Sequence, residues 1–210
     1  MEDLLELYER PVDPKQPVVC LDERPVQLLD SKRDGKPARP GRVARHDYEY
    51  TRCGTANVFC IVEPKRGVHL THATPRRTAK EFAEAMRLIA NRYRRADTIH
   101  LVLDNLSTHF RSSVLRTFGV SRGEKLWDRF TLHYTPTHGS WLNQAEIEVS
   151  LVSRECLGNR RISTFDILAS ETRAWAIEAD RAKRTIRWGF TRERARAKFR
   201  YRVNELRSED

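Results

Sequence analysis

The stretch ANVFCIVEPKRGVHLTHA, residues 56–73, decides much of the predicted fold. Its two halves, 56–62 and 67–73, are rich in apolar and β-branched residues and flank the turn sequence EPKRG, which is typical of a β-hairpin. The apolar run VVCL at 18–21 precedes the hairpin and predicts a short buried strand. We therefore expect the chain to begin its sheet with an antiparallel meander.

Helices and strands alternate after this meander. Thr78 and Glu81 form a capping box that opens a helix. The apolar residues of that helix follow a 3.6-residue period and are Phe82, Met86, Ile89 and Tyr93. The runs TIHLVL at 98–103 and FTLHY at 130–134 predict two more strands with a helix between them, and further helices are expected from about residues 141 and 163. This order predicts an α/β fold with a mixed five-stranded sheet flanked by helices, as in a ribonuclease-H-like fold.

Two of the predicted strands run into an aspartate. Asp22 follows VVCL, and Asp104 follows HLVL. In mixed α/β sheets, ligand sites gather at the carboxyl ends of parallel strands. One aspartate at a strand end is more often a turn or capping residue, but two on neighbouring strands repel each other unless a cation lies between them. Mg²⁺, which prefers oxygen ligands, is the cation that we expect.

A third acid is expected on the helix after the strand at 130–134. Glu146 and Glu148 are the candidates. Each lies about 80° from the centre of the apolar stripe of this helix, on opposite sides, at 100° per residue. Periodicity therefore leaves both residues open, and both also suit ordinary solvated positions.

The charge of the chain favours a polyanionic partner. Lys and Arg number 39 against 29 Asp and Glu, for a formal net charge of +10. Residues 181–202 alone hold ten basic residues and one acid, Glu193, with aromatic residues between them. We interpret this segment as a surface that follows phosphates; a solvated helix face is the alternative. A second basic run, residues 32–45, is rich in glycine and proline and predicts a loop.

Other compositional features exclude several classes of protein. No apolar run approaches the ~20 residues that a membrane span needs. The acidic start MEDLLELYER is not a signal peptide. The four scattered cysteines favour reduced thiols over a zinc site. We expect a cytoplasmic protein without a membrane partner.

Four stretches together resemble a known family. VVCLDE, HDYEYTRCGTANVF, LVLDNLSTH and HYTPTHGSWLNQAEIE are similar to the DDE transposase domain of the IS630 family, which is related to the Tc1/mariner transposases. The resemblance runs from about residue 10 to about residue 200. It implies that Asp22, Asp104 and Glu146 are the catalytic, metal-binding acids, because the family's glutamate follows a Leu-Asn pair by three residues.

The same resemblance points to residues around these acids. Asn105 and His109 match an Asp-Asn-x-x-x-His segment of the family. His138, Ser140 and Trp141 match the segment that ends in Ser-Trp-Leu-Asn. The resemblance implies that these five residues orient the site or touch DNA, and a capping or packing role is an equal alternative.

The activity that the resemblance implies is metal-dependent DNA cleavage and strand transfer in cut-and-paste transposition. Two Mg²⁺ ions, for which Mn²⁺ is expected to substitute, would lie roughly 3.5–4 Å apart, with Asp22 as the ligand that they share. The implied partners are double-stranded DNA and a second copy of the chain, in the cytoplasm at the nucleoid. The alternatives are a ribonuclease-H-like nuclease or resolvase, and an inactive DNA-binding remnant.

We expect three parts in the chain. Residues 1–16 would be a linker remnant, 17–185 the ribonuclease-H-like catalytic domain, and 186–210 a basic C-terminal helical tail. Family members usually carry a helix-turn-helix part before the catalytic domain, and we expect this chain to lack it. Its DNA binding would then be mostly electrostatic and only weakly specific for sequence.

Overall fold

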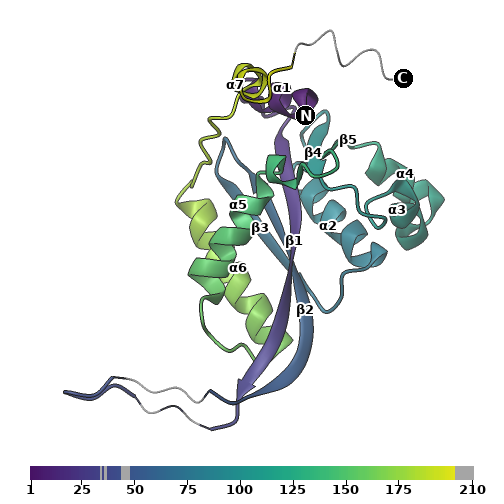
Figure 1. Ribbon diagram of the computed structural model, residues 1–210. Coiled ribbons are helices and arrows are strands. Elements are labelled where there is room, and N and C mark those ends of the chain that lie inside the picture. Colours follow the sequence, from purple (N-terminus) through teal and green to yellow (C-terminus); the bar gives the residue numbers. More distant parts are fainter. Residues whose placement is uncertain (34, 36, 44–47, 202–210) are drawn as a thin grey trace.

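A computed structural model describes residues 1–33, 35, 37–43 and 48–201 of the protein. Its centre is one five-stranded sheet in the order β3-β2-β1-β4-β5 (Figure 1). The antiparallel part consists of β1 (Val18–Ser31), β2 (Tyr50–Glu63) and β3 (Val68–Thr74). The strands β4 (Ile99–Leu103) and β5 (Phe130–Tyr134) extend the sheet in parallel with β1. The predicted mixed five-stranded sheet is thereby confirmed.

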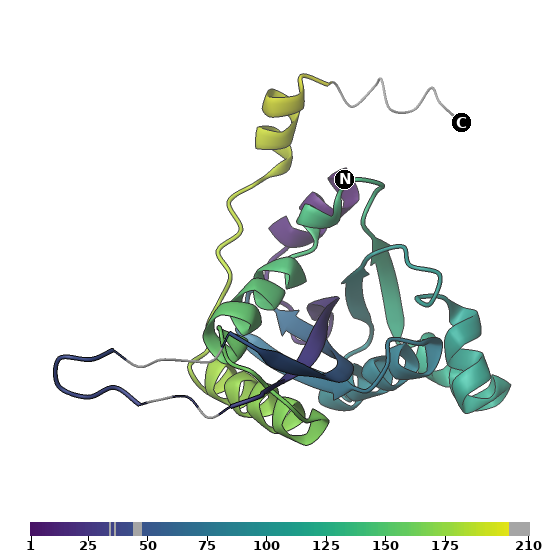
Figure 2. The ribbon, with the colours of Figure 1, turned by 60° about the horizontal axis from the view of Figure 1, so that its bottom comes forward.

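Helices cover both faces of this sheet (Figures 1 and 2). One side carries α2 (Ala79–Arg92), α3 (Arg111–Phe118) and α4 (Val120–Trp127). The other side carries α1 (Glu2–Glu9), α5 (Ala145–Leu151) and α6 (Phe165–Arg181). An extended segment after α6 leads to α7 (Arg192–Phe199), which lies beside α1.

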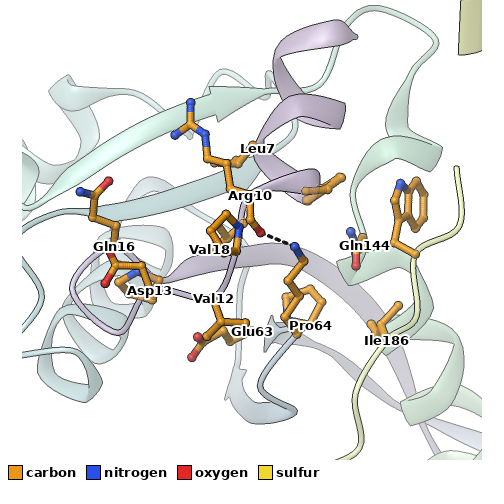
Figure 3. Close-up of a pocket in the computed structure, with 15 residues that line it drawn as sticks. Leu7, Arg10, Val12, Asp13, Gln16, Val18, Glu63, Pro64, Gln144 and Ile186 are labelled. Atoms are coloured by element: carbon orange, nitrogen blue, oxygen red, sulfur yellow. Dashed lines mark hydrogen bonds between the residues drawn. The ribbon is translucent and has the colours of Figure 1, made fainter. Parts of the chain in front are cut away.

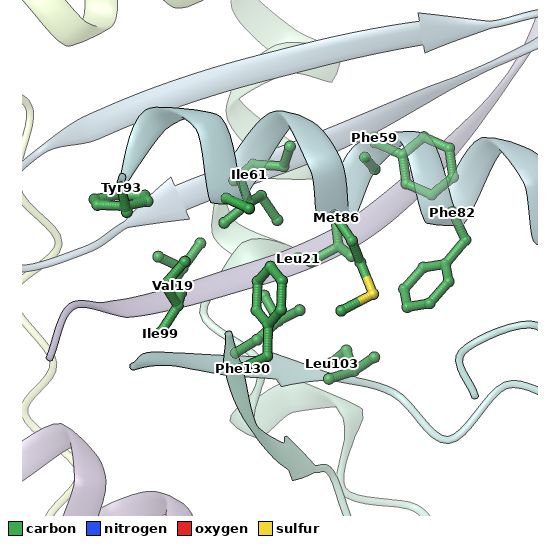
Figure 4. Packing of buried hydrophobic residues seen from close by; sticks show 14 of the residues in the cluster. Val19, Leu21, Phe59, Ile61, Phe82, Met86, Tyr93, Ile99, Leu103 and Phe130 are labelled. Atoms are coloured by element: carbon green, nitrogen blue, oxygen red, sulfur yellow. The ribbon is translucent and has the colours of Figure 1, made fainter. Parts of the chain in front are cut away.

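Alternation along the strands separates the core into two layers. Leu21 and Ile61 point to the side of α2, where they pack with its buried residues Phe82 and Met86 (Figure 4). Cys20, the neighbour of Leu21, points to the opposite side and packs with α1. Successive side chains of a strand face opposite ways, so each strand contributes to both layers. Complete burial of Phe82 or Met86 contributes about 1.5–3 kcal/mol to the free energy of unfolding.

The start of α2 is as predicted from the sequence. The hydroxyl of Thr78 caps the helix, and the Glu81 carboxylate accepts a hydrogen bond from the backbone N–H of Thr78 at 3.1 Å. The whole predicted stripe is buried: Phe82, Met86, Ile89 and Tyr93.

The first strand is longer than we expected. The prediction ended it at residue 21, whereas β1 continues through Asp22 and Glu23 to Ser31. The reason is β2, which begins at Tyr50 and pairs with β1 from Cys20 to Ser31, with a bulge at Leu28–Leu29. The two strands form a ribbon that extends beyond the rest of the sheet (Figure 1). Pairing with a long partner thus carries the strand through the charged residues Asp22, Glu23 and Arg24.

The helix expected from residue 141 is divided. A 3₁₀ turn (Ser140–Leu142) comes first, then α5, and then a π-helical turn (Val152–Leu157). The hydroxyl of Ser153 donates to the Val149 carbonyl at 2.7 Å, and the Gly158 N–H donates to the Ser153 carbonyl at 2.9 Å, as in a π turn. The next helix, α6, begins after its cap Thr164 and not after Ser163.

Parts of two sequence predictions lie outside the described residues. These are positions 34, 36, 44 and 45 of the predicted basic loop and positions 202–210 of the predicted tail. The quoted HDYEYTRCGTANVF begins with two more such residues, 46 and 47. Among the residues that are described, no helix is long and apolar enough to cross a bilayer.

Candidate active site

Asp22 lies in β1, and Asp104 directly follows the neighbouring parallel strand β4. The register of β1 and β4 places Cys20 beside Val102. The same register, continued by two residues, brings Asp22 level with Asp104, which directly follows β4. Asp22 shares the face of Cys20, toward α5, because side chains alternate along β1. The sheet therefore brings together the two aspartates that the sequence singled out, although Asp22 lies within a strand and not at its end.

Asn143 fastens the beginning of α5 to β1. Its Nδ2 donates a hydrogen bond to the carbonyl of Leu21 at 2.8 Å, and its Oδ1 accepts one from the Ala145 N–H at 3.1 Å. Asn143 is only 2% exposed, so water does not compete for these bonds. They hold the first turn of α5, and with it Glu146, over the face of β1 that carries Asp22.

The three acids share an unfavourable negative field. Burial raises the pKa of Asp22 to about 7, although the Glu23 N–H donates to its Oδ1 at 2.8 Å and opposes the rise. The charges of Glu146, Glu23 and Asp104 raise the pKa of Asp22 further. Asp22 would therefore gain most from a nearby cation, which would restore its charged form.

Glu146 and Glu148 occupy opposite environments. The carboxylate of Glu148 is completely buried and lies 2.8 Å from Nδ1 of His69 on β3. The other ring nitrogen of His69 donates to the Arg184 carbonyl at 2.8 Å. Burial by itself would lower the pKa of His69, but Glu148 raises it, which favours the imidazolium form beside the carboxylate. Glu148 is thus engaged in packing α5 on the sheet, whereas Glu146 is exposed and faces the solvent near Asp22.

A buried histidine joins Asp104 to a second acid of β1. His109 Nδ1 lies 2.7 Å from the Asp104 carboxylate, and its Nε2 lies 2.7 Å from Oε1 of Glu23. The imidazole stacks on Phe82 of α2 at a centroid distance of 4.4 Å. Burial would lower the pKa of His109, but its bonds to Asp104 and Glu23 outweigh this and raise the pKa to about 9. The ring therefore bears a proton on each nitrogen and holds the Asp104 carboxylate in place.

Glu23 is the residue that the sequence analysis missed. Its carboxylate is almost fully buried and, with Asp104 and His109, forms a group whose ligand atoms all lie within 4.8 Å of one another. Such a group could bind a metal ion only if His109 lost a proton, which its raised pKa of about 9 opposes at neutral pH. The sequence feature that could have indicated Glu23 is its position directly after Asp22. Because side chains alternate along a strand, Glu23 points to the opposite face of β1 from Asp22, toward α2.

The remaining predicted residues lie at the surface around the acids. Asn105 is exposed, and so is His138, whose backbone φ is 60°. Trp141 is 43% exposed and packs edge-to-face with Phe190 at 5.2 Å. An open pocket of about 460 Å³ joins Trp141 to Glu146. Of the predicted supporting residues, His109 contacts an acid directly, and the roles of Asn105, His138 and Trp141 stay predictions.

A more enclosed cavity lies away from the three acids. It has a volume of about 70 Å³ and lies between α1, the turn after β2 and the segment after α6 (Figure 3). The buried Oε1 of Gln144 and Nε1 of Trp188, both residues of its lining, have no hydrogen-bond partner in the described part of the chain. None of the three acids lines the cavity, so it is separate from their chemistry.

The basic C-terminal segment is partly neutralised within the molecule. Glu2 of α1 binds Arg196 of α7 through two hydrogen bonds of 2.8 and 2.6 Å. Glu9 accepts hydrogen bonds from the N–H and Nε of Arg192 at 2.8 and 2.9 Å. The stretch 1–16, which we expected to be a linker remnant, therefore contains a helix that is folded against the tail, and Leu5 is completely buried. The boundaries between the three expected parts stay predictions.

Comparison with known proteins concerns the family and the fold of the chain. The sequence profile of the DDE superfamily endonucleases matches residues 17–169. A solved structure described as the Mos1 mariner paired end complex with Mn is 15% identical, with a TM-score of 0.52, and the match covers 87% of this chain and 53% of that one. None of the curated proteins matches significantly.

A second solved structure is described as the Mos1 transposase paired-end complex with left transposon end. It is also 15% identical, with a TM-score of 0.42, and the match covers 87% of this chain and 59% of that one. The chain thus spans little more than half the length of either solved protein. At this identity, the likeness to the first structure concerns the fold.

Proposed function

Because the chain belongs to the DDE superfamily of endonucleases, we propose that it is the catalytic domain of a DNA transposase of the IS630 branch of the Tc1/mariner group. Its reaction would be the cleavage of double-stranded DNA at transposon ends and the transfer of the freed strand to a target. It would act as a homodimer at the nucleoid.

One observation supports this proposal: the charges of both Glu146 and Asp104 raise the pKa of Asp22, so the three acids lie near enough to repel one another. Asp22 and Asp104 come from the sheet, and Glu146 comes from the helix that Asn143 fastens beside Asp22. Acids in three separate parts of the chain do not come together for packing, because their mutual repulsion costs free energy.

The donor set fits a hard divalent cation. In the described part of the chain, neither Asp22 nor Glu146 forms an ion pair with a basic side chain, and the repulsion at Asp22 is left for a cation to relieve. We infer that Asp22, Asp104 and Glu146 hold Mg²⁺, or Mn²⁺ in its place, and that Asp22 is the shared ligand when two ions bind. Such ions lower the pKa of an attacking water and stabilise the leaving oxygen.

The surrounding residues orient the acids. His109 Nδ1 donates a hydrogen bond to the backbone carbonyl of Asp104 at 3.1 Å and lies 2.7 Å from its carboxylate, while Glu23 contacts the other ring nitrogen of His109. Asn143 ties the start of α5, the helix that carries Glu146, to β1. The fixed positions matter because a displacement of about 1 Å in such a site is enough to cost roughly 100-fold in rate.

The test is a nicking assay on supercoiled DNA with Mg²⁺ or Mn²⁺. We expect Asp104→Asn and Glu146→Gln to abolish metal-dependent nicking. Glu178→Gln, a change of an exposed glutamate on α6, is the matched control and should nick normally. Unchanged nicking by Asp104→Asn would place the chemistry elsewhere.

A second assay separates a transposase from a nuclease or resolvase of the same fold. A pre-cleaved duplex with a free 3′-hydroxyl is incubated with the full chain, metal and target plasmid. Covalent joining of the duplex to the plasmid is the expected result. Nicking without joining would favour the nuclease, and the absence of both would favour an inactive DNA-binding remnant.

A further inference from the structure

An exposed tryptophan lies beside the proposed metal ligand Glu146. Trp141 is 43% exposed and shares the pocket of about 460 Å³ with Glu146. The other residues of that lining are Ser140, Ile147 and Ser150. The exposed indole offers a flat apolar surface to a ligand in this pocket.

Trp141 is held from one side by the C-terminal segment. Its ring packs edge-to-face with Phe190 at 5.2 Å, and Phe190 packs in the same way with Phe199 at 6.3 Å. The ammonium of Lys198 lies 5.8 Å from the Phe190 ring and 5.9 Å from the Phe199 ring. The indole is therefore braced by an aromatic cluster that also carries a positive charge.

The position of the ring limits what can cover it. If Glu146 holds a metal ion at the scissile phosphate, the adjoining nucleotide lies within reach of the same pocket. A base inside a continuous duplex is stacked on both faces, so away from a duplex end a base must be unpaired to offer a face to the indole. Stacking on an aromatic ring accepts any base, and a nearby cation adds attraction to the backbone.

We propose that Trp141, braced by Phe190, is the stacking surface for an unpaired DNA base next to the scissile phosphate. This inference rests on the proposed function, and it adds that the strand is locally unpaired when it enters the site.

The test measures binding of a short single strand to the full chain in Ca²⁺, with intact strands verified on a gel. Removal of one stacked base costs roughly 1–3 kcal/mol, or about 5- to 150-fold in affinity. We expect Trp141→Ala to lose a factor in this range, while Trp141→Phe retains most of the affinity. Ile177→Ala, a change of a side chain on α6 that is 50% exposed, is the control and should bind as the unaltered chain does.

An abasic nucleotide, moved along the strand one position at a time, separates stacking from a merely structural role. At one position it should weaken binding to the unaltered chain and have no further effect on Trp141→Ala. Two results would overturn the proposal: unchanged binding by Trp141→Ala, or insensitivity of the unaltered chain to every abasic position. Asp104→Asn and Glu146→Gln decide the proposed function independently, because they are scored by nicking.

Discussion

Glu146 and Glu148 provide the sharpest test of the proposed site. They are only two positions apart, but replacement of Glu148 should lower stability, whereas replacement of Glu146 should abolish nicking. Glu148→Ala removes the partner of a completely buried His69 at 2.8 Å. Loss of one member of a buried ion pair costs about 3–5 kcal/mol. A domain of this size has roughly 5–15 kcal/mol of stability. At about 2–4 °C per kcal/mol, Tm should fall by roughly 6–20 °C.

Glu146→Ala should behave in the opposite way. Glu146 is exposed and has no ion pair in the described part of the chain. A surface change of this kind usually alters stability by no more than about 0.5 kcal/mol. We expect an unchanged Tm and no nicking.

The measurements are thermal and urea unfolding at neutral pH, and nicking at a temperature where both variants are folded. Glu148→Gln retains the shape and a hydrogen bond to His69, and should lie between Glu148→Ala and the unaltered chain in stability. The reasoning is refuted if Glu148→Ala unfolds within about 0.5 kcal/mol of the unaltered chain, or if Glu146→Ala still nicks.

Three further predictions follow from single contacts. Asn143→Ala leaves buried backbone groups without a partner and should lower the free energy of unfolding by about 1–3 kcal/mol. Nicking should be lost at temperatures where the chain is folded. Normal nicking would show that the hydrogen bonds of Asn143 do not position Glu146. Arg196 holds the pKa of Glu2 at about 2, below its usual 4.5, so the α1–α7 contact is stabilised above pH 4.5 and lost as pH falls toward 2. Amide exchange in α7 should rise over that range, and Glu2→Gln should weaken the pH dependence, leaving the part that comes from Glu9, whose pKa Arg192 also lowers; equal pH profiles would contradict this assignment. Thr78→Ala removes the α2 cap and should lower the free energy of unfolding, measured in urea, by about 1 kcal/mol. Phe82→Ala, a change in the core, should lower it by about 3–5 kcal/mol. A larger loss for Thr78→Ala than for Phe82→Ala would be inconsistent with the packing of α2.

Much of the fold was predictable because apolar periodicity is a local property. The hairpin at 56–73 and the stripe of α2 follow from spacings of two and of three to four residues, and both are present as expected. The length of β1 was not predictable in this way, since the charged residues Asp22, Glu23 and Arg24 interrupt the apolar run, and the strand continues through them where β2 pairs with it.

The residues of the candidate site also separate into those that local sequence indicated and those that depend on tertiary contacts. Asp22 and Asp104 could be proposed as a pair because each follows an apolar run, and the parallel register brings them level. Periodicity could not choose between Glu146 and Glu148, and the choice of Glu146 came from the resemblance. The buried contact of Glu148 with His69 supplies a physical reason for that choice.

By itself, the sequence determined the order of the helices and strands along the chain, the capped helix α2 and the pair of aspartates. Those features depend on neighbours within a few positions. Only the tertiary structure decided which polar groups meet. His69 and Glu148 are 79 positions apart, and Glu23 and His109 are 86 apart. The periodicity of a sequence does not indicate which distant residue a polar side chain will contact. Its role is therefore decided only when the register of the sheet and the packing of α5 bring distant residues within hydrogen-bonding distance.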